Sequence, residues 1–295
     1  MSFTEHNAGG LIFDTSDVIS AAPGVVHAFT TRHGGVSPAP FDSLNFADHH
    51  GDTNENLLEN YRRLGAAVGF DASRAVACRQ IHSDHVCVAR EEDAGKLLWD
   101  ERLDDGDALI TNVPDLPLFA YGTDCCVITL YDPSTRCIGA VHAGWRGTAS
   151  GIALKTAVTM MSYYGADPYT LRAAIGPSIG KCCFEVDEDV AHTFKALLDP
   201  AVDERIEQCG EKYRIDLKGI NRLWLLRAGI DPARVDVHPD CTKCHPERYW
   251  SHRAMGDKRG GMAGVICLGK IDDAPRFASF LRARAAFVAF GLLEL

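Results

Sequence analysis

Three short segments of this chain offer two histidines and a cysteine that could bind one metal ion. These residues are His82, one of the neighbours Cys125 and Cys126, and His142, in the short segments RQIH, TDCC and VHAGWRG. Imidazole nitrogen and thiolate sulfur are common zinc ligands, and three protein ligands leave a fourth position open, as in catalytic zinc sites. The residue types therefore predict an enzyme with a metal centre.

The elements that must position these residues include a β-hairpin. Residues 127–131 and 138–142 are short apolar runs on either side of Asp-Pro-Ser-Thr, a sequence typical of a turn. Antiparallel pairing would bring His142 beside the step between Cys125 and Cys126. Neighbouring strand residues point to opposite faces, so only one of the two cysteines can reach a given metal. His82 precedes another predicted strand and could complete the set.

The remaining pattern predicts an α+β fold with mixed, largely antiparallel sheets, because strands follow one another before any crossover helix. No repeat or linker divides the chain, so residues 1–295 are expected to form one domain. Further strands are expected at 25–31, 86–89, 108–111, 116–121, 172–175, 235–238 and 262–268. Helices are expected at 54–68, 148–164, 187–198 and 217–228.

Composition narrows the possible partners. Hydrophobic residues make up 46% of the chain and charged residues 24%, as in ordinary globular proteins. A net charge of −10 argues against nucleic acid or an anionic membrane as a partner. No signal peptide or membrane-spanning segment is evident, so a cytoplasmic protein is expected. The eleven cysteines, several of them adjacent, do not resemble a secreted disulfide framework.

Three other segments have a weaker signal. Arg146 follows His142 near a predicted helix start, where it could bind an anion or belong to a tight turn. The segment 175–180 resembles a phosphate loop in composition but lacks its lysine, so a buried turn is expected. Residues 241–245, Cys-Thr-Lys-Cys-His, match the spacing for haem attachment, which requires export. A second zinc site there, using His238 or His252, is not predicted, because only one Cys-x-x-Cys is present.

A set of short motifs runs in order from about residue 24 to 268. The motifs are FTTRHGGVS (29–37), SLN (43–45), QIH (80–82), TDC (123–125), HAGWRG (142–147), IGP (175–177), CFEV (183–186), DL (216–217), CT (241–242) and SHR (251–253). In these motifs the chain resembles the laccase-domain, or polyphenol-oxidase-like, family, whose characterised members act as purine nucleoside phosphorylases. Residues 271–295 have no counterpart and form a C-terminal extension. The chain departs from the family pattern at Cys126, Ser178 and Lys181.

The resemblance implies a four-layer α/β/β/α sandwich with zinc on His82, Cys125 and His142. It also implies phosphorolysis of adenosine, inosine, guanosine and methylthioadenosine, with adenosine deaminase activity at the same site. The partners would then be purine nucleosides and phosphate, and no protein partner can be inferred. Two alternatives use the same residues: a copper-dependent polyphenol oxidase, and a Cys-His hydrolase involved in peptidoglycan editing.

An acidic chain needs a local cationic pocket for phosphate. Arg32 and Arg146 are the candidates, because a guanidinium group matches the geometry of oxyanions. Asn45 could orient phosphate or ribose. Asp124 or Glu185 could transfer a proton, which makes Cys125, His142 and Asp124 the predicted catalytic residues.

Overall fold

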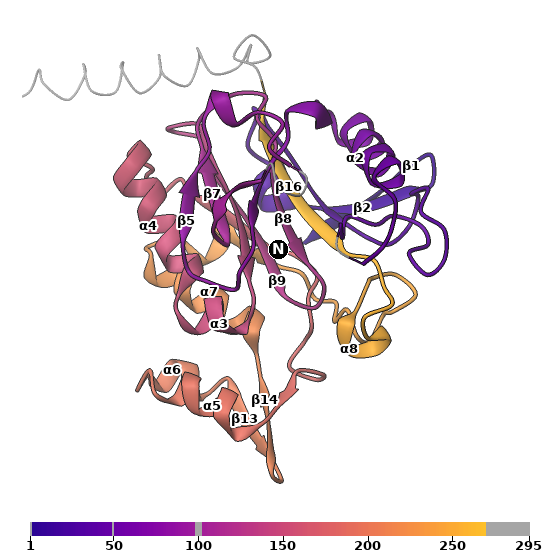
Figure 1. Ribbon diagram of the computed structural model, residues 1–295. Helices are drawn as coiled ribbons and strands as arrows, with labels where there is room; N and C mark the ends of the chain where they lie inside the picture. Colours follow the sequence, from indigo (N-terminus) through magenta and orange to yellow (C-terminus); the bar gives the residue numbers. More distant parts are fainter. Residues whose placement is uncertain (1, 49, 98–101, 270–295) are drawn as a thin grey trace, which may run out of the picture.

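The fold is built on two β-sheets that pack face to face, seen in a computed structural model that describes residues 2–48, 50–97 and 102–269 (Figure 1). The larger sheet has seven strands in the order β1-β2-β3-β16-β8-β4-β6. Its strands are β1 (Phe3–Ala8), β2 (Leu11–Ser16), β3 (Val25–Thr30), β16 (Met262–Leu268), β8 (Leu118–Gly122), β4 (Val76–Arg79) and β6 (Leu103–Asp105).

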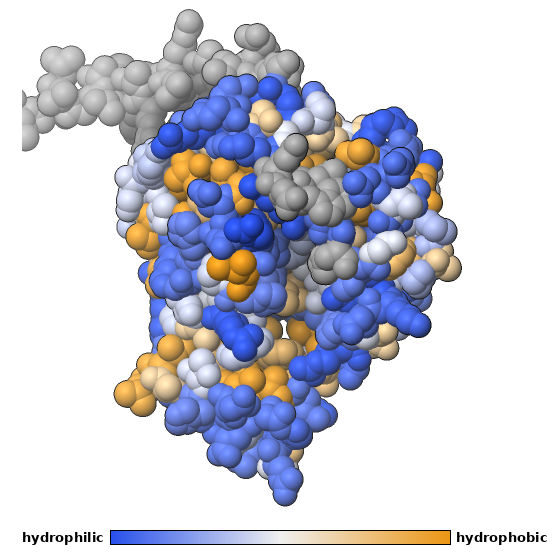
Figure 2. Space-filling view, in the orientation of Figure 1, coloured by the Kyte–Doolittle hydropathy of each residue, from blue (hydrophilic) through white to orange (hydrophobic). Residues whose placement is uncertain are grey.

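The second sheet has six strands in the order β15-β11-β9-β10-β7-β5. These are β15 (Val235–Val237), β11 (Arg172–Ile175), β9 (Cys126–Asp132), β10 (Cys137–Ala143), β7 (Ala108–Thr111) and β5 (Val86–Val88). A small third sheet, β12-β14-β13, projects from the body with α5 and α6 (Figure 1) and has a hydrophilic outer end (Figure 2). Its strands are β12 (Glu185–Val186), β14 (Lys212–Ile215) and β13 (Ile206–Cys209).

Helices cover the outer faces of both large sheets (Figure 1). The helices are α1 (Asp17–Ser20), α2 (Asn54–Val68), α3 (Trp145–Ala149), α4 (Ile152–Tyr164), α5 (Glu188–Lys195), α6 (Pro200–Asp203), α7 (Leu217–Arg227) and α8 (His252–Met255). Short 3-10 turns occur at Ala72–Arg74, Glu91–Asp93 and Pro232–Arg234. Within the described ranges, none of these helices has the length and apolar character needed to cross a membrane.

Three layers of apolar core confirm the predicted four-layer α/β/β/α sandwich. One core lies between the six-stranded sheet and α3, α4 and α7, with Ile128 and Met160 among its members. A second lies between the two sheets and includes Val127 and Ile138. A third lies between the seven-stranded sheet and α2 and contains Leu57.

The alternation of side chains along β9 and β10 decides what faces the space between the sheets. Val127 belongs to the core between the sheets, whereas Cys126 and Ile128 belong to the core on the helix side. His142 pairs with Val127 across the ladder and therefore shares its face. The end of this inter-sheet layer is where the candidate site lies.

Most predicted elements are confirmed, but the helix expected at 148–164 is interrupted. α3 ends at Ala149 and α4 starts at Ile152, with Gly151 between them at a φ of 76°. This left-handed conformation suits glycine and stops a continuous helix. The predicted C-terminal extension, 271–295, lies outside the described residues.

Candidate metal centre

The β9–β10 hairpin brings Cys125 and His142 together. Antiparallel register pairs His142 with Val127 and Ala143 with Cys126, which confirms the predicted hairpin. Cys125 directly precedes β9 and shares the face of Val127. One ligand atom each from His82, Cys125 and His142 lies within 4.8 Å of the others.

Cys126 lies on the opposite face of the same strand. Its side chain is fully buried in the core on the helix side, and its Sγ is 3.3 Å from Ser178 Oγ. Burial raises the pKa of this thiol to about 11, so it stays protonated at neutral pH. Only Cys125 of the pair reaches the two histidines.

A strained loop holds His82 in place. His82 has a φ of 61°, which is uncommon for a residue with a side chain. The backbone N–H groups of Ile81, His82 and Ser83 donate to the carboxylate of Asp107 at 3.3, 3.1 and 2.5 Å. These three hydrogen bonds stabilise a conformation that the chain would otherwise rarely adopt.

Gln80 ties the same loop to β8. Its Nε2 donates to the carbonyl of Tyr121 at 2.9 Å, and its Oε1 accepts from the Tyr121 N–H at 2.7 Å. The amide side chain thus acts as a backbone-like partner at the end of the strand. His82 is thereby fixed relative to the turn that holds Cys125.

Asp107 is a residue of the candidate site that the sequence patterns did not single out. Its Oδ1 accepts from His142 Nδ1 at 2.8 Å, and its carboxylate also accepts from Ser83 Oγ at 2.7 Å. Burial of Asp107 opposes ionisation, but hydrogen bonds from His142 and Ser83 outweigh it and lower its pKa to about 2. An ionised Asp107 only accepts, so His142 Nδ1 carries a hydrogen and Nε2 is the nitrogen left for a metal ion, which would displace the proton from it.

Gly144 leaves the space in which the three side chains meet. A Cβ atom at this position would lie 2.9 Å from His82 Cδ2 and 3.4 Å from both Cys125 Sγ and His142 Cε1. A side chain there would displace His82 first. The glycine of the HAGWRG motif therefore allows the cluster to form.

The electrostatics favour an ionised cysteine. Burial opposes ionisation of Cys125, but the charge and hydrogen bonding of His142, with a smaller contribution from His82, lower its pKa to about 6. Burial also opposes protonation of His142, which Cys125 and Asp107 overcome, raising its pKa to about 9. A thiolate and two imidazoles are donors that suit a borderline-soft metal ion, so the residues fit a metal site.

The cluster opens into a cavity of about 370 Å³. The cavity has an aromatic part, formed by Phe46 and Tyr121, and a cationic part, formed by Arg102 and Arg259. The rest of its lining consists of Ala47, Asp48, Gln80, His82, Gly122, Thr123, Cys125, His142 and Gly261. Its size and mixed lining are typical of small-molecule sites.

Arg259 is the cation with spare hydrogen-bonding capacity. Its Nη1 donates to Thr123 Oγ1 at 3.1 Å and to the carbonyl of Gly260 at 3.0 Å. Its Nε is buried and has no hydrogen-bond partner among the described residues. Arg102, in contrast, already forms an ion pair with Asp48.

The residues predicted to bind phosphate do not line this cavity. The Arg32 guanidinium lies 3.8 Å from the Trp250 ring centroid and donates to the carbonyls of Asp42 and Pro246. Arg146 is exposed and lies over the ring of Trp145, 4.2 Å from its centroid.

Asn45 is fully buried next to the cavity wall. Its Oδ1 accepts from the N–H groups of Ala47 and Gly261, both at 2.8 Å, and its Nδ2 donates to Asp52 at 2.9 Å. Asn45 thereby holds two lining segments together instead of facing the cavity.

The two residues predicted to transfer a proton form hydrogen bonds with residues outside the cavity lining. Asp124 Oδ1 accepts from Thr242 Oγ1 at 2.6 Å, and its Oδ2 accepts from the Arg253 N–H at 2.8 Å. Glu185 lies in β12, outside the lining, with its carbonyl accepting from Arg253. Asp124 directly precedes Cys125 and helps to fix the turn that presents it.

The family of this chain is shown by a match that spans most of its length. Residues 26–269 match the family described as multi-copper polyphenol oxidoreductase laccase. The chain belongs to this family. The matched range contains every residue of the His82, Cys125 and His142 cluster and of the cavity.

Relatives in the laccase family carry names from nucleoside metabolism. Purine nucleoside phosphorylase YlmD of Geobacillus stearothermophilus is 35% identical over 82% of this chain and 90% of its own. Adenosine deaminase RL5, from an unknown prokaryote, is 33% identical over 80% of this chain and 91% of its own. The crystal structure of the Geobacillus YlmD, 32% identical, matches with a TM-score of 0.84 over 91% of this chain and 99% of that one.

The family description mentions several copper ions, and the described part of this chain offers two clusters of metal-ligating side chains. One is His82, Cys125 and His142. The other consists of four cysteines and no histidine. Two histidines and one cysteine are also the ligand set of mononuclear blue-copper sites, so the donors of the first cluster suit zinc or copper, whereas four thiolates without a histidine do not form a histidine-rich oxidase site.

Proposed function

We propose that this protein is a zinc-dependent purine nucleoside phosphorylase acting on adenosine, inosine, guanosine and methylthioadenosine, with adenosine deaminase activity at the same site. The observation that carries the proposal is the three-ligand cluster at the base of a cavity with one aromatic and one cationic part. The names of the relatives supply the substrate class.

His82, Cys125 and His142 would hold the zinc ion, with His142 oriented by Asp107. Zinc takes tetrahedral sets of nitrogen and sulfur ligands, and three protein ligands leave one position for a small molecule. When bound, the ion supplies a Lewis acid that polarises an oxygen or water in the cavity.

Arg259 is our candidate for binding phosphate. In phosphorolysis a phosphate oxygen forms a bond to the anomeric carbon of the ribose while the bond to the purine breaks. The phosphate must therefore be held beside the sugar, and the unpartnered Nε–H of Arg259 is a donor suited to it. Arg102 adds positive charge, although Asp48 offsets part of it. Arg32, Asn45 and Arg146 would then act on the surrounding structure instead of on phosphate.

The partly buried ring of Tyr121 gives the cavity an aromatic surface on which a purine can lie, and the buried ring of Phe46 packs in the core beside it. Tyr121 is itself fixed, because its hydroxyl is 2.8 Å from that of Tyr61 and its backbone is held by Gln80. A rigid aromatic wall places the base at a constant distance from the metal centre. This arrangement supports purine nucleosides over smaller substrates.

The test compares adenosine and inosine with and without phosphate, using the full chain. We expect phosphate-dependent release of adenine and hypoxanthine with equimolar ribose 1-phosphate, and phosphate-independent conversion of adenosine to inosine. Arg259→Gln should raise the KM for phosphate about 10- to 100-fold, the loss expected for one charged hydrogen bond. Arg146→Gln is the matched control and should leave it unchanged. Equal effects of the two variants would refute the phosphate site.

A Cys-His hydrolase is the second candidate, because Cys125, His142 and Asp107 also have the order of a nucleophile, a base and an orienting carboxylate. Chelation distinguishes the two functions. A hydrolase would retain activity in excess chelator and lose it to a thiol-alkylating reagent. A zinc phosphorylase would lose activity to the chelator and regain it when zinc is added back.

A further inference from the structure

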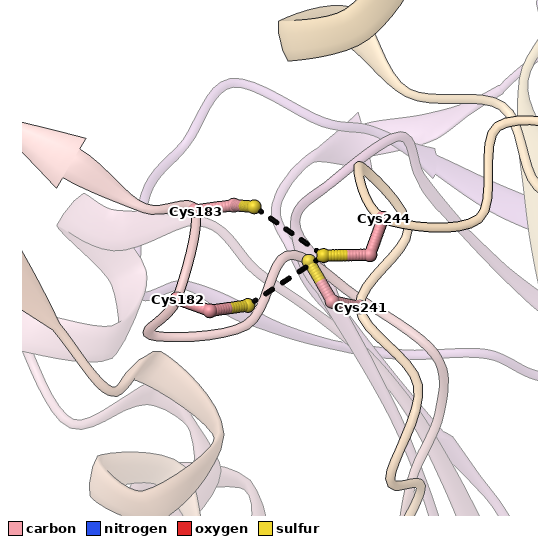
Figure 3. A group of neighbouring side chains, drawn as sticks. All are labelled: Cys182, Cys183, Cys241 and Cys244. Carbon is pink, nitrogen blue, oxygen red and sulfur yellow. Dashed lines mark hydrogen bonds between the residues drawn. The ribbon is translucent and has the colours of Figure 1, made fainter.

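Four cysteines from two distant segments meet at the base of the projecting sheet (Figure 3). Cys182 and Cys183 lie between β11 and β12, and Cys241 and Cys244 lie between β15 and α8. Their sulfur atoms all lie within 4.8 Å of one another. All four are free thiols, and none belongs to the cavity or to the first cluster.

Parallel strand pairing explains why the two segments meet. β11 and β15 pair in parallel, with Ile175 opposite Val237, so both strands end at the same edge of the sheet. A parallel bridge between Ser178 and Cys241 extends the pairing past the strand ends. The two cysteine pairs follow on adjacent connections.

The distances between the sulfur atoms fit a tetrahedral metal site. Cys182 Sγ and Cys183 Sγ lie 3.8 and 3.5 Å from Cys244 Sγ. A regular tetrahedron with metal–sulfur distances of about 2.3 Å has sulfur–sulfur distances of about 3.8 Å. A disulfide would instead require about 2.05 Å.

The backbone around Cys241 is arranged for a thiolate. The N–H of Gly180 donates to Cys241 Sγ at 3.2 Å. A Cβ on Gly180 would lie 3.2 Å from both Cys182 Sγ and Cys241 Cβ, so glycine allows this close approach.

We propose that Cys182, Cys183, Cys241 and Cys244 bind one structural zinc ion. A set of four thiolates satisfies the tetrahedral preference of zinc and leaves no position for a substrate, which is the arrangement of structural zinc sites. Cys182 and Cys244 are exposed, which gives the ion a path of entry. The proposal does not depend on the activity of the first cluster.

The ion would clamp two connections that also support the candidate active site. The N–H of Ile179 donates to the carbonyl of Asp124 at 2.9 Å, and Thr242 Oγ1 donates to its carboxylate at 2.6 Å. Each donor lies on one of the two clamped connections, and Asp124 directly precedes Cys125. The structural zinc would thus help to fix the turn that carries the candidate metal ligand Cys125.

The first experiment counts metal and thiols on the full chain. We expect zinc bound in addition to that on the first cluster, so that His82→Ala/Cys125→Ala/His142→Ala retains one equivalent. Cys241→Ser/Cys244→Ser should lose one equivalent relative to the unaltered chain. Cys209→Ser, a change at a cysteine of the same projection outside the cluster, is the matched control and should lose none.

A second measurement does not use the double serine variant and so remains valid where that variant fails to fold. It uses the His82→Ala/Cys125→Ala/His142→Ala variant, which lacks the first cluster. Four thiols of this variant should be protected from a thiol reagent while zinc is bound and should react with the reagent after chelation. Three results would each overturn the proposal. They are thiol reactivity that does not change on chelation, bound iron in place of zinc, and a chain mass lower by four hydrogens, as two disulfides would give. Failure of the nucleoside assay alone would not affect it, because no activity is measured.

Discussion

Asp107→Asn removes the negative charge of the side chain that orients two of the three candidate metal ligands. The shape of the side chain stays nearly the same, because one carboxylate oxygen is replaced by an NH₂ group. In the folded protein Asp107 is 2% exposed. Its Oδ1 accepts from His142 Nδ1 and from the His82 N–H, and its Oδ2 accepts from Ile81 and Ser83. The same carboxylate therefore sets the ring of His142 and the loop of His82.

The expected loss of zinc affinity follows from the number of hydrogen bonds that an amide side chain can accept. If the asparagine oxygen keeps the bonds to His142 and His82, its NH₂ group faces the N–H groups of Ile81 and Ser83, donor against donor. The reverse orientation loses His142 instead. Loss of such an outer partner typically weakens metal binding about 10- to 100-fold, or about 1.4 to 2.8 kcal/mol.

The assay is a competition titration of zinc between the stripped chain and a chromophoric chelator. A four-cysteine site would contribute equally to the unaltered chain and to the variant, so the difference reports on the three-ligand cluster. Asp105→Asn is the matched control, because Asp105 is exposed, lies two residues away and pairs with Arg79. Zinc affinity of Asp107→Asn within twofold of the control would refute the orienting role.

Three further predictions concern other positions. Gly144→Ala should weaken zinc binding about tenfold or more, because its Cβ would displace His82; an unchanged titration would contradict this. Cys125→Ala should abolish zinc binding at the cluster, whereas Cys126→Ala should keep it and lose about 1–2 kcal/mol of unfolding free energy. Burial lowers the pKa of His27 to about 3 from 6.5, so the unfolded chain takes up a proton first as pH falls. Denaturant titrations should show a loss of about 2 kcal/mol from this group between pH 7 and 5, and His27→Gln should lack that part of the loss.

The part of the candidate site that the sequence could predict is local. A turn of four residues between two apolar runs determines the β9–β10 hairpin, and the period of two along a strand separates Cys125 from Cys126. The resemblance to a family selected Cys125 from the pair and added His82. None of these steps requires knowledge of which strands are neighbours in the two sheets.

Asp107 and Arg259 could not be found in this way, because their roles depend on non-local pairing. Asp107 directly precedes β7, and it reaches His142 because β7 pairs with β10. Arg259 lies in the connection between β15 and β16, which runs from the six-stranded sheet to the seven-stranded sheet. The predicted Arg32 and Arg146 matched motifs near the site in sequence, but their guanidinium groups lie over tryptophan rings outside the cavity.

The four-cysteine cluster escapes sequence-based prediction for the same reason. The Cys-x-x-Cys segment is only half of the ligand set, and the other half is not a nearby histidine but an adjacent cysteine pair on a connection far earlier in the chain. The pairing of β11 with β15 is parallel, so it needs a long crossover and leaves no turn signature in the sequence. Two predicted strands that are each followed within about ten residues by two cysteines are nevertheless a detectable pattern. If such strands are parallel neighbours, their ends meet at one edge of the sheet, and the four thiols that follow them must then gather there.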